Sequence, residues 1–212
     1  MPPNRLRAAG LLVAFLLGRA TAAELPNLQD PKVQYDLGMS QLLGREGPAA
    51  PAEGVVWLRK AAVQGYADAQ VQLGVCYQQG LGVEKDLPQA LAWFRRAADQ
   101  GNARGQLQVA LGYLRGEGVA PDLKQALGYL QRAAEQGHPK AQFELGVAYR
   151  DGLGVAPDPE QAAFWLGLAA GQGSMAARAI LASAEQKLSP EQRGRVDARR
   201  KAWIAQHPPR TP

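Results

Sequence analysis

The chain has 212 residues, of which 46% are hydrophobic and 20% charged, and its formal net charge is +5. This composition is typical of a globular protein and excludes an intrinsically disordered chain, which lacks the apolar side chains needed to form a core. The sequence contains one cysteine. No disulfide can therefore form within the chain, and its hydrophobic core must stabilise the folded state.

The first 23 residues have the features of a secretory signal peptide. Arg5 and Arg7 form a basic start, residues 11–17 are apolar, and residues 20–23 supply a small-residue cleavage site. The apolar run is shorter than the roughly 20 residues that span a bilayer. This favours cleavage over the alternative of a retained membrane anchor. We therefore predict export to the periplasm, with no integral membrane segment left after cleavage.

Removal of this leader changes the charge of the chain. The leader contains three arginines and no acidic residue, so its loss takes the formal charge from +5 to about +2. A mature charge this small gives no basis for nucleic-acid binding.

The strongest pattern in the sequence is a repeat of 36 residues. Glycine recurs at this interval without any insertion in the register, and so do a pair of alanines, an aromatic residue, a Gly-x-Gly turn and an aspartate. The glycines are Gly65, Gly101, Gly137 and Gly173, and the aromatic residues are Trp57, Trp93, Tyr129 and Trp165. A period of this length predicts a repeat protein in which each unit packs on the next.

Each unit has the pattern of two helices. In residues 67–102, apolar and small residues recur at helical spacing until the glycines of 80–82, which can adopt the left-handed conformation that closes a helix. Asp86 can then cap a second helix, with Pro88 in its first turn and Gly101 at its end. The sequence thus predicts an all-α fold, a right-handed α/α superhelical solenoid of four 36-residue helix pairs.

The two ends of this array depart from the repeat. The first unit has residues 47–51 in place of the glycine turn, and the last helix opens with a capping-box pattern at Ser189. We predict that this arginine-rich helix is a cap whose basic face is solvated, the alternative being contact with phospholipid head groups or an acidic partner. The predicted parts are a signal peptide (1–23), a linker (24–30), a degenerate repeat (31–66), three full repeats (67–102, 103–138 and 139–174), C-terminal capping helices (175–206) and a disordered tail (207–212).

The pattern resembles the Sel1-like repeat (SLR) family, an α/α relative of the tetratricopeptide repeat. The resemblance is carried by Ala-x-x-x-Leu-Gly-x-x-Tyr-x-x-Gly-x-Gly-Val-x-x-Asp followed by Ala-x-x-Trp-x-x-x-Ala-Ala-x-x-Gly, and it extends from residue 31 to about residue 188. It implies scaffolding and partner binding. Some exported relatives with two cysteines per unit have been linked to β-lactam binding. This chain lacks those cysteines, so that link does not extend to it.

The residues that usually support catalysis are sparse. His138 and His207 are the only histidines, neither has an evident partner, and no His/Cys/Asp/Glu cluster has metal-ligand spacing. We predict no enzymatic activity, no cofactor and no metal. We expect Cys76 to be a small buried residue on a helix, and a reactive thiol is the alternative.

The outward positions of the first helices predict a partner-binding groove, by analogy with tetratricopeptide arrays. Apolar side chains there form rows edged by cations, as in interaction sites, and an amphipathic or extended segment with some acidic residues would fit. The alternative is that the apolar side chains pack between neighbouring helices. The predicted groove residues are Tyr35, Met39, Val71, Val75, Arg104, Leu107, Leu111, Leu114, Arg115, Lys140, Phe143, Val147 and Arg150.

The expected function is that of a periplasmic protein-binding solenoid. Some short exported Sel1-like repeat proteins are immunity partners of phospholipase effectors of the type VI secretion system, so the resemblance implies a secreted toxin as one possible partner. A housekeeping scaffold for another envelope protein is the alternative within the same class. A hydrolase or a cell-wall-ligand binder is the alternative from a different class.

Overall fold

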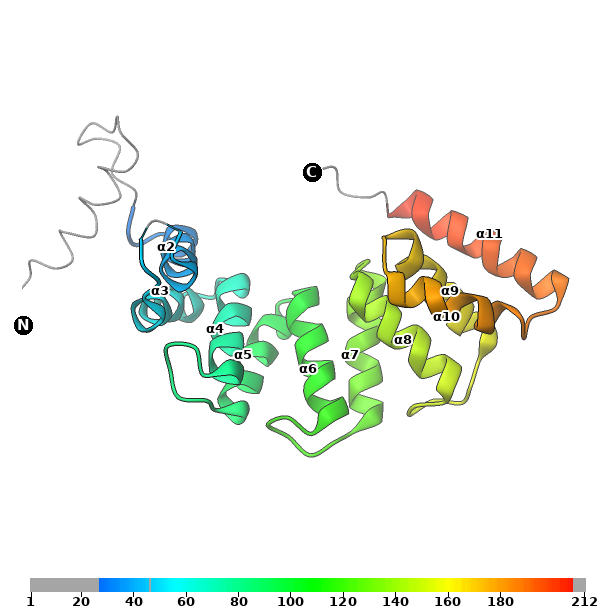
Figure 1. Ribbon diagram of the computed structural model, residues 1–212, viewed down its shortest axis with the longest axis horizontal. Helices are drawn as coiled ribbons and strands as arrows, with labels where there is room; N and C mark the ends of the chain where they lie inside the picture. The colour runs from blue at the N-terminus through cyan, green and yellow to red at the C-terminus, as the bar shows by residue number, and fades with distance from the viewer. Residues whose placement is uncertain (1–26, 46, 208–212) are drawn as a thin grey trace, which may run out of the picture. The chain divides into compact units, whose positions relative to one another are not determined.

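The computed structural model describes residues 27–45 and 47–207, and every regular element within them is a helix. The predicted signal peptide lies outside these residues, and so does the predicted tail except for His207. The helices follow one another along the chain (Figure 1). They are α2 (Pro31–Leu43), α3 (Pro51–Val63), α4 (Ala67–Gln79), α5 (Leu87–Asp99), α6 (Ala103–Arg115), α7 (Leu123–Glu135), α8 (Pro139–Asp151), α9 (Pro159–Gly171), α10 (Met175–Glu185) and α11 (Pro190–Gln206).

The helices form the predicted solenoid of 36-residue repeats. The first helices α2, α4, α6 and α8 each begin 36 residues after the one before, and so do the second helices α3, α5, α7 and α9. The chain divides into two compact units, one with α2–α4 and one with α5–α11. Within each unit, every helix up to α10 packs on the next one in sequence. The predicted all-α solenoid is thereby confirmed.

Short polar contacts set the helix ends. The carboxylate of Asp86 accepts a hydrogen bond from the backbone N–H of Gln89 at 2.9 Å, which is the predicted N-cap, and Asp122 and Asp158 repeat it at α7 and α9. Each of the first helices α2, α4, α6 and α8 ends at a glycine in the left-handed region.

The second glycine of the turn serves packing as well as backbone conformation. Gly118 has a φ of +77°, and a Cβ added there would lie 2.4 Å from the carbonyl oxygen of Leu87 at the start of α5. The turn after α6 therefore lies directly against the backbone of the preceding second helix, which leaves no room for a side chain.

A set of buried glutamines links neighbouring helices through side-chain hydrogen bonds. Gln142 is fully buried in α8, its Nε2 donates to the carbonyl oxygen of Ala134 at 3.2 Å, and its Oε1 accepts from Nε2 of Gln172 at 2.7 Å. The chain repeats the amide–amide pair in α6–α7 and α2–α3. These pairs satisfy polar groups within the core, as buried amides require.

The last helix closes the second unit, although it does not continue the repeat. Ser189 and Gln192 form the predicted capping box, and α11 packs against α9. Eight of the 13 residues of α9 are buried, because α8, α10 and α11 all pack against it. The predicted role of α11 as a cap agrees with this packing.

The arginines of α11 hold the cap in place. Arg195 forms an ion pair with Glu160 at 2.6 Å, and the Arg199 guanidinium lies 3.8 Å from the centroid of the Phe164 ring. Arg200 pairs with Glu185, and it lies so close to α9 that a side chain at Gly167 would overlap its guanidinium. Arg195 and Arg199 remain exposed, in agreement with the predicted solvated face, and their head groups also contact α9.

Candidate functional site

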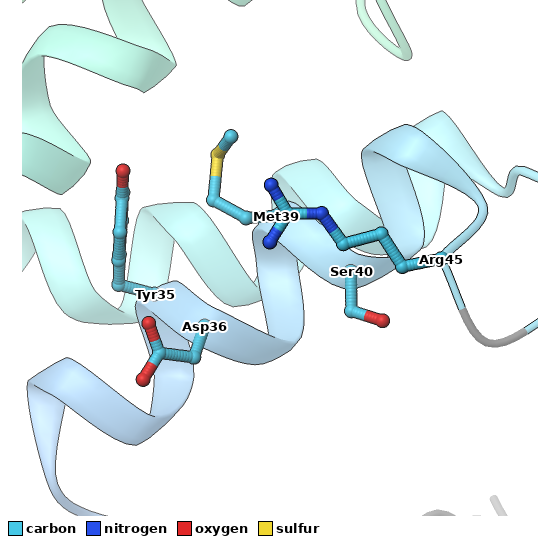
Figure 2. Close-up of a pocket in the computed structure, with 5 residues that line it drawn as sticks. All are labelled: Tyr35, Asp36, Met39, Ser40 and Arg45. Atoms are coloured by element: carbon cyan, nitrogen blue, oxygen red, sulfur yellow. The ribbon is translucent and has the colours of Figure 1, made fainter.

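In the first unit, the predicted groove residues of α2 line a small hollow. Tyr35 and Met39 are half-buried and project to the same side of α2, with the Arg45 side chain reaching back towards Met39 (Figure 2). Asp36 and Ser40 complete the lining of a cavity of about 270 Å³. This volume is below the roughly 300–1,000 Å³ of small-molecule sites. The hollow suits a single side chain or small group of a partner.

Sequence reasoning identified two of these five residues and missed three. The spacing along α2 indicated Tyr35 and Met39, but it gave no sign that the turn after α2 brings Arg45 back over the helix. The Asp36 carboxylate accepts a hydrogen bond from Lys32 Nζ at 2.7 Å, so its charge is partly matched within α2. The five lining residues include neither a histidine nor a cysteine, and nothing in the hollow has the arrangement of a catalytic base and nucleophile.

One of the two predicted groove residues of α4 is inaccessible. Val71 is 1% exposed, and Val75 is half-buried. Val71 therefore belongs to the core and cannot contact a partner, contrary to its place among the groove residues. The helical phase placed it outward, but the fold covers that side of α4.

Cys76 is the small buried residue that the sequence predicted. Its side chain is fully buried, and burial raises the pKa of the thiol to about 11. A thiol with this pKa carries almost no thiolate at neutral pH, and the thiolate is the reactive form. The structure thus favours the inert reading of Cys76 over a reactive one.

We expect the native protein to resist Ellman's reagent at pH 8, because Cys76 is both buried and protonated. The same protein in guanidinium chloride should react completely with one equivalent, and absorbance at 412 nm measures both cases. The chain has no other cysteine, so the signal reports this residue alone. Rapid stoichiometric labelling of the native protein would contradict the buried position.

In the second unit, two of the predicted groove residues lie in the core. Leu107 is 3% exposed and Leu111 is 5% exposed, and both belong to a hydrophobic cluster with Leu130 of α7 and Leu145 of α8. The prediction that they line an open groove is wrong for these side chains. They pack between neighbouring helices instead.

The other predicted residues of α6 and α8 remain on the surface. Leu114, Phe143 and Val147 pack against the core and stay half-buried. Arg104, Arg115 and Lys140 are exposed, and Arg150 is half-buried. We call this set the α6–α8 face, and its members are Arg104, Leu114, Arg115, Lys140, Phe143, Val147 and Arg150.

The cations of the α6–α8 face differ in their partners. Arg150 binds the Asp151 carboxylate through two hydrogen bonds of 2.6 and 2.7 Å, and the Arg150 hydrogen bonds lower the pKa of that carboxyl. Arg115 lies 3.8 Å from Glu117. Among the described residues, Arg104 and Lys140 have no carboxylate within 4.0 Å. Two positive charges at the N-terminal ends of α6 and α8 are therefore available to a ligand.

The charges of both cations act on His138, which lies two residues before Lys140. The histidine caps α8, and its Nδ1 accepts from the backbone N–H of Ala141 at 3.5 Å. Burial and the positive charge of Arg104 lower the pKa of His138, and Lys140 adds to this effect. The ring is accordingly neutral at physiological pH, and its role as a helix cap accounts for its position.

The described part of the chain offers no other obvious chemistry. No group of three or more His, Cys, Asp or Glu side chains within it could hold a metal ion. None of its helices combines the length and the apolar character needed to cross a bilayer. The α6–α8 face of the second unit and, separately, the hollow on α2 in the first unit are the described surfaces best suited to recognition.

Comparisons with solved structures agree with this reading of the fold. A Sel1 repeat protein from Oxalobacter formigenes is 30% identical over 86% of this chain and 72% of that chain, with a TM-score of 0.67. The protective antigen c5321 of uropathogenic Escherichia coli, described as displaying an SLR fold, is 28% identical over 85% of this chain and 47% of that chain, with a TM-score of 0.58.

A third likeness is more distant. The immunity protein Pa5087 from Pseudomonas aeruginosa is 19% identical over 87% of this chain and 85% of that chain, with a TM-score of 0.39. Similarity at this level carries no implication for what the present chain binds. No protein of curated function matches the chain.

The family model for the Sel1 repeat matches residues 31–66, 67–102, 103–138 and 139–174. Sel1 repeats mediate protein–protein interaction, and their solenoid is typically a non-enzymatic scaffold. Because the four matched stretches cover more than half of its length, the chain belongs to the Sel1 repeat family.

Proposed function

We propose that this protein is an exported binding module that recognises a partner protein through the α6–α8 face. The observation that carries the proposal is the set of half-buried apolar side chains Leu114, Phe143 and Val147, which lie on the same two helices as the exposed cations Arg104 and Lys140. An apolar patch rimmed by charge is typical of protein interaction sites. The family's role in protein–protein interaction supports the same function.

The site of action that we propose is the periplasm. The basic start, the short apolar run and the small residues of positions 1–23 support cleavage and export.

The partner that we propose is a secreted phospholipase toxin of the type VI system, which this protein would neutralise. The support is the resemblance to short exported Sel1-like repeat proteins with that role. The alternative is a scaffold for a resident envelope protein of the same cell. The two differ in whether binding abolishes the activity of the partner.

Affinity capture tests the proposed function. Residues 24–212 would be the bait against a periplasmic extract and, separately, against candidate phospholipase effectors encoded beside the gene. A Leu114→Ser/Phe143→Ser variant should lose at least about tenfold in affinity, because central apolar contacts dominate interfaces. Circular dichroism would check that the variant folds.

A matched control uses two leucines of the second unit outside the α6–α8 face. Leu123 is 40% exposed and Leu153 is 41% exposed, so a Leu123→Ser/Leu153→Ser variant should bind as the wild type does. A stoichiometric phospholipase whose activity is lost on binding would identify an immunity protein. Equal binding by both variants would show that a partner uses another surface.

A further inference from the structure

Two cations of the α6–α8 face sit at the same end of neighbouring first helices. Arg104 is the second residue of α6, and Lys140 is the second residue of α8. Both are exposed, and they stand 36 residues apart at the same position of successive repeats. The two positive charges therefore lie at the starts of the two helices that carry the face.

Their position opposes the stability of their own helices. The N-terminus of a helix carries a partial positive charge, so a cation in the first turn is unfavourable by about 0.3–1 kcal/mol. Other helices of the unit follow the favourable rule, with Glu160 in the first turn of α9 and Glu191 in that of α11. Stability alone would favour acidic residues in place of Arg104 and Lys140.

The caps of these two helices are not carboxylates. Asn102 caps α6 and His138 caps α8, whereas the second helices α5, α7 and α9 are each capped by an aspartate. Lys124 also lies in the first turn of its helix, α7, but the Asp122 carboxylate caps that helix. Arg104 and Lys140 thus meet two helix ends whose positive charge no cap carboxylate offsets.

Beyond Arg104 and Lys140, the face has apolar residues in its middle and arginines that form ion pairs at its far end. Phe143 and Val147 follow Lys140 along α8, and Leu114 lies near the far end of α6. The far end holds Arg115 and Arg150, which pair with Glu117 and Asp151. Glu144, one turn after Lys140 on α8, is half-buried and forms no ion pair with it among those found in the described residues. Positive charge without an ion-pair partner is therefore concentrated at the helix starts.

We infer that the occupant of this face is an acidic amphipathic segment of the partner protein, oriented with its carboxylates on Arg104 and Lys140 and its apolar side chains on Leu114, Phe143 and Val147. This inference deepens the proposed function and rests on it. Carboxylates would gain charge-assisted hydrogen bonds from both cations and favourable interaction with the two helix ends. Apolar residues that follow them would cover the half-buried side chains.

A charge-swap selection tests the inference. A display library of random dodecapeptides would be selected against the mature chain and against its Arg104→Glu/Lys140→Glu variant. The wild type should enrich peptides that combine Asp or Glu with large apolar residues, and the variant should enrich Lys and Arg instead. A peptide selected on the wild type should bind the variant at least about tenfold more weakly, and added salt should weaken its binding to the wild type.

The control makes the same change of charge elsewhere in the unit. Lys124 and Lys201 are exposed, and Lys124 occupies the same first-turn position in α7 as Arg104 does in α6. A Lys124→Glu/Lys201→Glu variant should select the same peptides as the wild type. The Arg104→Glu/Lys140→Glu variant should melt no lower than the wild type, because acids suit a first turn, so misfolding would not account for a loss of binding.

Several results would overturn the inference. They are enriched peptides without acidic residues, equal affinity in the charge-swap variant, and a library that yields no binder while vesicles of anionic phosphatidylglycerol bind through these two cations. A captured partner that requires Leu114 and Phe143 but tolerates Arg104→Glu/Lys140→Glu would overturn the acidic segment and leave the proposed function standing. A partner that ignores both variants would contradict the proposed function itself.

Discussion

A Gln142→Glu substitution is expected to destabilise the protein by about 3–5 kcal/mol at pH 7, since it buries an ionised carboxylate of nearly the same shape. Gln142 is fully buried, and its Nε2 donates to the carbonyl oxygen of Ala134 at 3.2 Å. A carboxylate oxygen in that place would face another acceptor. Gln172 Nε2, now 2.7 Å from Oε1 of Gln142, could still donate to the other oxygen. One retained hydrogen bond does not offset the desolvation of a charge.

The loss of stability caused by Gln142→Glu should become smaller as the pH falls. Burial would raise the pKa of the new carboxyl in the folded state above the roughly 4.3 of an unfolded glutamate. The variant therefore keeps its stability at a pH below the pKa of the carboxyl in the unfolded chain. It loses stability as the pH rises through the pKa of the same carboxyl in the folded chain. The free energy of urea unfolding should therefore recover in the variant, relative to wild type, between pH 7 and pH 4.

Gln125→Glu supplies the control for this prediction. Gln125 is exposed in the first turn of α7, so a carboxylate there keeps its hydration and should cost less than about 1 kcal/mol at either pH. If Gln142→Glu unfolded at the same urea concentration as wild type at pH 7, the glutamine would not be sealed from solvent as the structure places it.

Local signals explain why much of the fold could be predicted. A helix cap such as Asp86 and a terminating glycine such as Gly80 act on neighbouring residues, so the chain marks each boundary at the position where it occurs. The 36-residue period then predicts that each unit packs like the one before. The capping box at Ser189 followed from the same kind of local pattern.

The accessibility of the candidate site could not be predicted from helical phase. The period indicates which side of α6 carries Leu107 and Leu111, but their burial depends on how closely the neighbouring helices approach. Phe143 occupies in α8 the repeat position of Leu107 in α6, and it remains half-buried. Residues at equivalent repeat positions thus differ in exposure because their neighbours differ.

Two other features of the structure differ in whether a pattern in the sequence indicates them. The buried glutamines recur at the same 36-residue interval as the glycines, as Gln34, Gln70, Gln106 and Gln142, and a search for polar periodicity would have found them. The packing of α11 on α9 has no such signal, because it occurs once. The arginines that contact α9, including Arg195 and Arg199, lie on an exposed face of α11, and no pattern in the sequence indicates what they contact.

A Gly118→Ala substitution is expected to cost about 3 kcal/mol of unfolding free energy, more than a left-handed conformation alone requires. An alanine at φ +77° costs roughly 1–2 kcal/mol, and a Cβ 2.4 Å from the Leu87 carbonyl oxygen must also push the turn away from α5. Chemical denaturation of the variant beside wild type measures the total.

Two further glycines of the second unit separate these contributions. Gly101 has a φ of +81° with nothing within 4 Å of an added Cβ, so Gly101→Ala should show the conformational cost alone, about 1 kcal/mol. Gly128 lies within α7 with the same open surroundings, and Gly128→Ala should stabilise the protein by about 0.5–1 kcal/mol because alanine favours a helix. Equal losses at Gly118 and Gly101 would mean that the turn yields to the new methyl group. A larger loss at Gly118 would show that the Gly-x-Gly turn fixes how a first helix packs against the second helix before it, which is the contact that each repeat must reproduce for the solenoid to extend.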